Sequence, residues 1–137
     1  MTKQIWLNLP VKNVAKSKEF FSQLGFAFST ENGNSANSAC MLIGEKGVVV
    51  MLFDEPTFKS FTKADIPDTA KGTEVLFSID AESRDDVDIM AVKVTKAGGK
   101  LFGQPAANQG WMYGFGFADL DGHRWNVLYM DMSQMPG

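Results

Sequence analysis

Histidine and cysteine are almost absent from this chain, whose 137 residues include one of each, His123 and Cys40. A single cysteine excludes a disulfide within the chain. Zinc, nickel and iron sites normally draw on several histidine, cysteine or carboxylate ligands, so this composition disfavours such a site. Cys40 is expected to act as a small buried apolar residue, because no basic neighbour in the sequence would activate its thiol.

Long apolar runs and basic clusters are also lacking. The longest apolar run, residues 48–53, is far too short to cross a bilayer, and the opening MTKQIWLNLPV does not have the pattern of a secretory signal. The net charge of -3 arises from acids and bases spread along the chain, without the basic patch that nucleic acid requires. We therefore expect a soluble, cytoplasmic protein that binds neither nucleic acid nor a membrane.

Hydrophobic residues, at 45%, suffice for one globular domain over residues 1–137, and the element pattern within it occurs twice. Each half has strand-like alternation, then helical spacing, then a short strand and an apolar hairpin. The second helix is marked by a capping box of Ser83 and Asp86 and by a stop at Gly98. The predicted segments are strands at 4–11, 26–30, 73–80 and 100–104, helices at 13–25 and 83–99, and hairpins at 38–53 and 111–130. We assign module one to about 1–54, a connector with one helical turn to about 55–72, module two to about 73–131, and a short tail to the remainder.

The face that each strand residue occupies follows from parity, because opposed residues of an antiparallel pair point the same way. A two- or four-residue turn at Asp-Leu-Asp-Gly would place Asn126 on one face with an aromatic wall. That wall comprises Trp111, Tyr113, Phe115 and Phe117. The same reasoning groups Met51 and Phe53 with Cys40 and Ser38, and offers Trp6, Asn8, Glu74, Leu76 and Ser78 from the strands that open the halves. His123 would then lie on the other face of the sheet from Asn126, and we interpret it as a rim or structural residue rather than a reactive one.

The duplicated strand-helix-three-strand unit, the opening NLPVKNVAKSKEFFSQLGF and the closing FADLDGHRWNVLYMD resemble the vicinal oxygen chelate superfamily. This superfamily includes glyoxalases, bleomycin-resistance proteins and extradiol dioxygenases. The sequence is most similar to bacterial glyoxalase-like members, predicted lactoylglutathione lyases. The resemblance implies an α+β fold, in which two βαβββ modules in one chain form an open, barrel-like mixed sheet with a central cleft. It also implies a homodimer, and Met132 and Met135 near the C-terminus are expected to offer apolar contact surface for it.

Enzymes of this family hold a divalent metal with four inward side chains, commonly His, Glu or Gln, His and Glu. Position by position, the resemblance places these ligands at Trp6, at or near Met51, at Glu74 and at Asn126. Only Glu74 is a good ligand for a hard cation, and Asn126 offers at most a carbonyl oxygen. We therefore predict no bound metal and no other cofactor.

Several residues have both a structural and a functional interpretation. Glu74 is either a charged residue at the solvent end of a strand or a catalytic acid inside the cleft. Asn126 is either a hydrogen-bonded core amide or the group that orients a ligand. The remaining candidates for substrate binding are either core or pocket residues: Trp6, Asn8, Met51, Trp111, Tyr113 and Phe115.

Two classes of function fit these residues. In the first, the protein binds a small planar or amphipathic molecule in its cleft without a metal, as the bleomycin-resistance branch does. In the second, it is a metal-dependent lyase, isomerase or dioxygenase that uses Glu74 in an atypical site. The missing histidines favour the first class.

Overall fold

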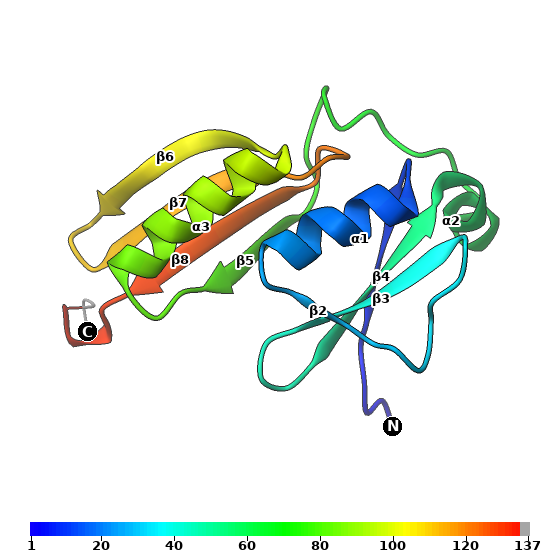
Figure 1. Ribbon diagram of the computed structural model, residues 1–137, viewed down its shortest axis with the longest axis horizontal. Helices are drawn as coiled ribbons and strands as arrows, with labels where there is room; N and C mark the ends of the chain where they lie inside the picture. Colours follow the sequence, from blue (N-terminus) through cyan, green and yellow to red (C-terminus); the bar gives the residue numbers. More distant parts are fainter. Residues whose placement is uncertain (135–137) are drawn as a thin grey trace. The chain divides into compact units, whose positions relative to one another are not determined.

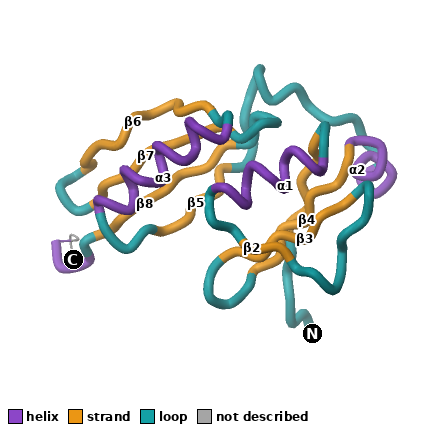
Figure 2. The backbone as a smooth tube through the Cα atoms, viewed as in Figure 1, coloured by secondary structure: helices purple, strands orange, loops and turns teal. Residues whose placement is uncertain are grey.

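The computed structural model describes residues 1–134, which fold into two compact units, Met1–Asp68 and a second that begins at Thr69 (Figure 1). Each unit contains one four-stranded mixed sheet, so the α+β fold with two βαβββ modules is confirmed. Figure 2 shows the same succession of strand, helix and three strands in both units. No helix in residues 1–134 has the length and apolar character needed to cross a membrane.

The first unit has the strand order β1-β4-β3-β2, in which β1 runs parallel to β4 and the other pairs are antiparallel. Its elements are β1 (Leu7–Val11), α1 (Val14–Gln23), β2 (Ala27–Phe28), β3 (Ser38–Ile43), β4 (Val48–Asp54) and α2 (Glu55–Thr62). Helix α1 begins where the Asn13 side chain accepts a hydrogen bond from the backbone N–H of Lys16. It packs Phe20 and Phe21 against β3 and β4, which makes the core of this unit.

The second unit repeats this order as β5-β8-β7-β6. Its elements are β5 (Leu76–Asp80), α3 (Arg84–Ala97), β6 (Lys100–Asn108), β7 (Met112–Ala118), β8 (Arg124–Met130) and the short 3-10 helix η1 (Met132–Gln134). The predicted ends of α3 are confirmed: the Ser83 hydroxyl accepts from the N–H of Asp86, and Gly98 ends the helix with φ of 104°. The buried residues Val87, Ala91 and Val94 pack this helix onto the sheet.

Element lengths differ from the prediction at three places. Strand β2 has two residues rather than five, because the Ser29 hydroxyl accepts from the N–H groups of Glu31 and Asn32 and turns the chain into a loop. Strand β6 has nine residues rather than five, and its pairing with β7 is interrupted by two irregularities. The connector forms α2, an eight-residue helix capped by Asp54, instead of a single turn.

The predicted faces of the last hairpin are wrong. Ala118 opposes Arg124, and the Asp119 backbone N–H still donates to the carbonyl oxygen of His123, so only three residues form the loop tip. Its last residue, Gly122, has φ of 85°, as a three-residue hairpin requires. An odd loop length reverses the parity that two- and four-residue turns share. Asn126 therefore opposes Gly116, while Trp125 opposes Phe117.

The aromatic residues of this hairpin thus face α3. Phe115, Phe117 and Trp125 are buried, and the rings of Phe117 and Trp125 stack with centroids 6.2 Å apart. We call the side of the second sheet opposite α3 the far face. Asn126 belongs to this far face together with glycines rather than to the aromatic wall.

Candidate functional site

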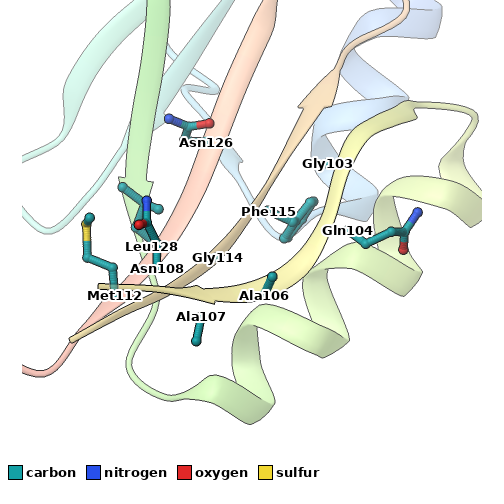
Figure 3. Close-up of a pocket in the computed structure, with 10 residues that line it drawn as sticks. All are labelled: Gly103, Gln104, Ala106, Ala107, Asn108, Met112, Gly114, Phe115, Asn126 and Leu128. Carbon is teal, nitrogen blue, oxygen red and sulfur yellow. The ribbon is translucent and has the colours of Figure 1, made fainter. Parts of the chain in front are cut away.

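A hollow of about 400 Å³ lies on the second sheet (Figure 3). Its lining comes from β6, β7 and β8 and consists mainly of small, amide-bearing and apolar residues. These are Gly103, Gln104, Ala106, Ala107, Asn108, Met112, Gly114, Phe115, Asn126 and Leu128. No lining side chain carries a charge, so the hollow suits an uncharged part of a ligand.

The hollow exists because side chains are missing from the middle of the far face. Gly114 opposes Leu128 and Ala106, and Gly116 opposes Asn126 and Gly103. A methyl group on Gly114 would lie against the carbonyl oxygen of Val127 and 2.6 Å from Leu128 Cδ2, so the strands require glycine there.

Two β-bulges shape the wall formed by β6. Between Leu101 and Gly103, and again between Gly103 and Ala106, this strand carries more residues than β7 opposite. Bulges bend an edge strand and redirect its side chains. The first bulge leaves Phe102 with its ring over Gly116, where a Cβ would collide with it.

Asn126 is half-buried on β8, with Ser78 of β5 beside it on one side and Gly116 of β7 on the other. Its side chain makes no hydrogen bond with any residue in the 1–134 range. A buried core amide would be hydrogen-bonded, so Asn126 is not a satisfied core amide. Its amide donors and carbonyl acceptor remain available to a molecule in the hollow.

The other predicted residues of this hairpin serve the side that faces α3. The hydroxyl of Tyr113 donates to Asp88 Oδ1 at 2.7 Å, and the Arg84 guanidinium carbon lies 5.0 Å from the centre of its ring. The hydrogen bond to Asp88 raises the pKa of Tyr113. The Trp111 indole N–H donates to Gln109 in the turn before β7. Of the predicted aromatic wall, only Phe115 contributes to the hollow.

In the first unit, the structure brings two predicted residues together. Asn8 pairs with Met51, and Met51 pairs with Cys40, so the grouping by parity is confirmed there. The loop at 29–37 lies against this surface: a Cβ on Gly33 would stand 2.9 Å from Cys40 Cβ and 3.0 Å from Met51 Cε. Trp6 precedes β1 and is 55% exposed.

The Asn34 side chain fixes that loop. Its Nδ2 donates to the carbonyl oxygens of Ser29 and Asn32, and its Oδ1 accepts from the N–H of Cys40 at 3.2 Å. The Ser38 hydroxyl donates to the carbonyl oxygen of Gly33 at 2.8 Å. Cys40 is consequently buried, and Met51 has the protein's own backbone over it.

The opening of the β7–β8 hairpin is organised by Asp119, which is 7% exposed. Its carboxylate accepts hydrogen bonds from the backbone N–H groups of Asp121 and His123 and from the Trp125 indole N–H. Burial raises the pKa of Asp119, and the nearby His123 and these hydrogen bonds lower it by less. The arrangement matches the structural interpretation of His123, whose backbone closes the loop.

Comparison with known proteins identifies the superfamily of this chain. A family model described as the Glyoxalase/Bleomycin resistance protein/Dioxygenase superfamily matches residues 3–127. The chain belongs to this superfamily. A hypothetical protein from S. aureus is 32% identical with a TM-score of 0.83, over 94% of this chain and 95% of that one. No protein with a curated description matches significantly.

Two further solved structures are similar in fold alone. A glyoxalase/bleomycin resistance protein/dioxygenase family enzyme from Burkholderia phytofirmans PsJN is 14% identical with a TM-score of 0.77, over 91% of this chain and 96% of that one. A genomically encoded fosfomycin resistance protein from Listeria monocytogenes is 14% identical with a TM-score of 0.69, over 98% of both chains. The narrower similarity to lactoylglutathione lyases remains a prediction.

The residues at the superfamily's metal positions do not fit a divalent ion. Trp6 and Met51 offer no oxygen or imidazole ligand, and Glu74 is exposed ahead of β5. The strand neighbour of Asn126 is Ser78, four residues after Glu74. Within residues 1–134, no group of three or more His, Cys, Asp and Glu side chains is arranged to hold a metal.

Most residues of the hollow were missed from the sequence. Gly103, Ala106 and Gly114 carry no chemical function, and their role lies in leaving space. A signal was nevertheless present, because glycines within an apolar strand such as MYGFGFA mark a bulge, a close backbone approach or a ligand surface. The bulges of β6 had a comparable signal in Gly103 and Pro105, since glycine and proline within a strand are typical of bulges and edge strands.

Proposed function

We propose that the protein binds a small, planar or amphipathic organic molecule in the hollow on the second sheet, without a tightly bound metal. The observation that carries this proposal is the half-buried Asn126 amide, which has no hydrogen-bond partner in residues 1–134 and lies beside a floor of glycines. A free amide in an otherwise apolar hollow can fix the orientation of a ligand that both donates and accepts. Superfamily membership supports small-molecule chemistry as the role of the fold.

The lining specifies the ligand further. On the far face, Asn126 and Asn108 offer amide groups, while Met112 and Leu128 offer apolar surface. Glycine and alanine on the floor leave a flat surface against which a planar ring can lie. The part of the ligand in the hollow is therefore uncharged and flat, with at least one hydrogen-bonding group.

The metal-dependent alternative would need a different donor set. Glu74 is the only strong ligand among the four positions that hold the metal in superfamily enzymes, so these positions do not supply the donors of a metal-assisted reaction.

The test uses benzamide, a planar neutral molecule whose amide complements that of Asn126. Titration into the 15N-labelled full chain should shift the backbone signals of Gly103, Ala106, Gly114 and Asn126 in a saturable way. Gly103→Val should weaken binding at least tenfold, because the added side chain fills the hollow. A Cβ at this position meets only ordinary contacts, the nearest 3.9 Å away.

Gly72→Val is the matched control, since a Cβ there meets nothing within 4 Å and Gly72 does not line the hollow. Asn126→Leu, which keeps the approximate size and removes the amide, should weaken binding with little loss of fold. Shifts that are absent, that cluster elsewhere, or that survive Gly103→Val unchanged would refute the proposal.

A further inference from the structure

Arg124 is an unpaired cation at the edge of the hollow. Its guanidinium carbon lies 4.5 Å from the centre of the Phe102 ring, and the side chain is half-buried. Within residues 1–134 it makes no hydrogen bond and no ion pair. The N–H donors of a half-buried arginine normally bind a carboxylate, a carbonyl oxygen or a ligand. The guanidinium N–H groups of Arg124 are therefore available to a ligand.

Strand geometry places the Arg124 side chain next to the amide of Asn126. Arg124 and Asn126 are two residues apart on β8, so both side chains project to the far face, separated by about 7 Å along the strand. In the neighbouring strands, Arg124 opposes Leu76 and Ala118, neither of which can pair with it.

Phe102 holds the guanidinium in position. The ring lies over Gly116, at the bulge of β6, in space that is open to it because Gly116 has no side chain. Cation–π attraction restricts the guanidinium while its N–H donors stay available. A pre-positioned guanidinium is well suited to bind the two oxygens of an oxyanion.

The acidic residues nearest to Arg124 leave its guanidinium N–H donors unpaired. Glu74 lies two residues before Leu76, the strand neighbour of Arg124, and forms no ion pair with it in the described part of the chain. Asp80 opposes Leu128, two residues beyond Asn126 on the other side. The far face therefore carries its positive charge on one side of Asn126 and Asp80 on the other.

We propose that Arg124 binds an oxyanion of the ligand, so that the molecule in the hollow is a small organic acid: a flat, uncharged body beside Asn126 and a carboxylate, phosphonate or phosphate group at Arg124. This inference rests on the proposed function, because the body of the ligand occupies the same hollow. Phe102 acts as a positioning residue, which holds the guanidinium without contacting the anion.

The test compares benzoate, phenylphosphonate and benzamide, which share one ring and differ in the attached group. In chemical-shift titrations of the parent at low ionic strength, benzoate or phenylphosphonate should bind at least five times more tightly than benzamide. Arg124→Gln should abolish this preference, weakening anion binding about tenfold while leaving benzamide affinity unchanged. The anion that binds more tightly shows whether Arg124 prefers a carboxylate or a phosphonate.

Lys96→Gln is the matched control, because it removes the same charge from an exposed position on α3, across the sheet from the far face. It should leave all three affinities unchanged, whereas Phe102→Leu should weaken only anion binding. Equal binding of benzoate, phenylphosphonate and benzamide to the parent, or an equal loss for all three in Arg124→Gln, would overturn the role of Arg124 while the proposed function stands. Failure of all three probes to bind would overturn both proposals.

Discussion

Asp119 is the residue that joins the β7–β8 loop to the core of the second unit. One carboxylate oxygen accepts two backbone N–H groups of the loop, and the other accepts the indole N–H of the buried Trp125. These bonds satisfy donors that would otherwise be unpaired next to the core. The same burial makes the charged form of the carboxyl costly, so its pKa is raised.

This raised pKa predicts a pH dependence of stability with a definite sign. From about pH 4 upward, where an unfolded aspartate has lost its proton, the native state still holds the proton on Asp119. Native protein then binds more protons than unfolded protein, so the free energy of unfolding falls as the pH rises through this window and stays lower above it. Urea unfolding across this pH range should show the parent losing stability relative to Asp119→Asn, which has no titrating group at this position. A relative gain of the parent with rising pH would contradict the assignment.

At the scale of elements, the far face of the second sheet depends on three glycines in β6 and β7. They differ in what a side chain would meet: backbone at Gly114, the end of a half-exposed ring at Gly116, and only an ordinary contact, 3.9 Å from the Gly116 nitrogen, at Gly103. Backbone cannot move without separating two strands, whereas a ring can rotate away.

Alanine substitutions should therefore rank in a fixed order. Gly114→Ala should cost about 2 to 3 kcal/mol of unfolding free energy, since it forces β7 and β8 apart, while Gly116→Ala should cost about 1 kcal/mol through displacement of Phe102. Gly103→Ala should change stability by less than about 1 kcal/mol. Chemical denaturation of the three variants measures the order. A cost at Gly103 as large as that at Gly114 would show that the floor of the hollow is wrongly placed.

The hairpin shows how far the sequence alone could determine this surface. Both strands and the turn residues of 119–122 were predictable, because apolar alternation and a glycine mark them locally. The face of Asn126 was not, because it depends on whether the loop tip has two, three or four residues, and Gly122 fits more than one of these. One residue of difference moved Asn126 from a wall of aromatics to a floor of glycines.

The ends of helix α3 were predictable, because they depend only on residues close in the sequence. The Ser83 cap and the Gly98 stop act within one turn of the chain, so their residues determine the structure directly. Gly103 and Pro105 are local marks of an irregular strand, but the register of the β6 bulges depends on how this edge strand pairs with β7. The hollow could not be predicted from residue types, because it is formed by missing side chains rather than by reactive groups.

At the scale of the whole molecule, the two units have the same topology but differ in one surface. Both sheets have the same strand order, and both place one helix on one side. In the first unit, the loop at 29–37 covers Cys40 and Met51, and Asn34 holds it there. In the second unit, the corresponding side carries the hollow, Asn126 and Arg124. The two modules thus differ at this side, since one is covered by its own loop and the other is hollow.

The exposed apolar side chains of the molecule predict its assembly. Ile5, Trp6 and Met132 are 78%, 55% and 63% exposed, and Met135, which was also expected to offer apolar surface, lies outside the described residues. Apolar side chains in contact with water favour association, and the commonest symmetric assembly of identical chains is a dimer. We therefore expect a homodimer with twice the 15.0 kDa mass of one chain. Light scattering coupled to size exclusion, repeated over a dilution series through the micromolar range, measures this mass. A single-chain mass throughout the series would contradict the homodimer and show that these side chains are tolerated in solvent.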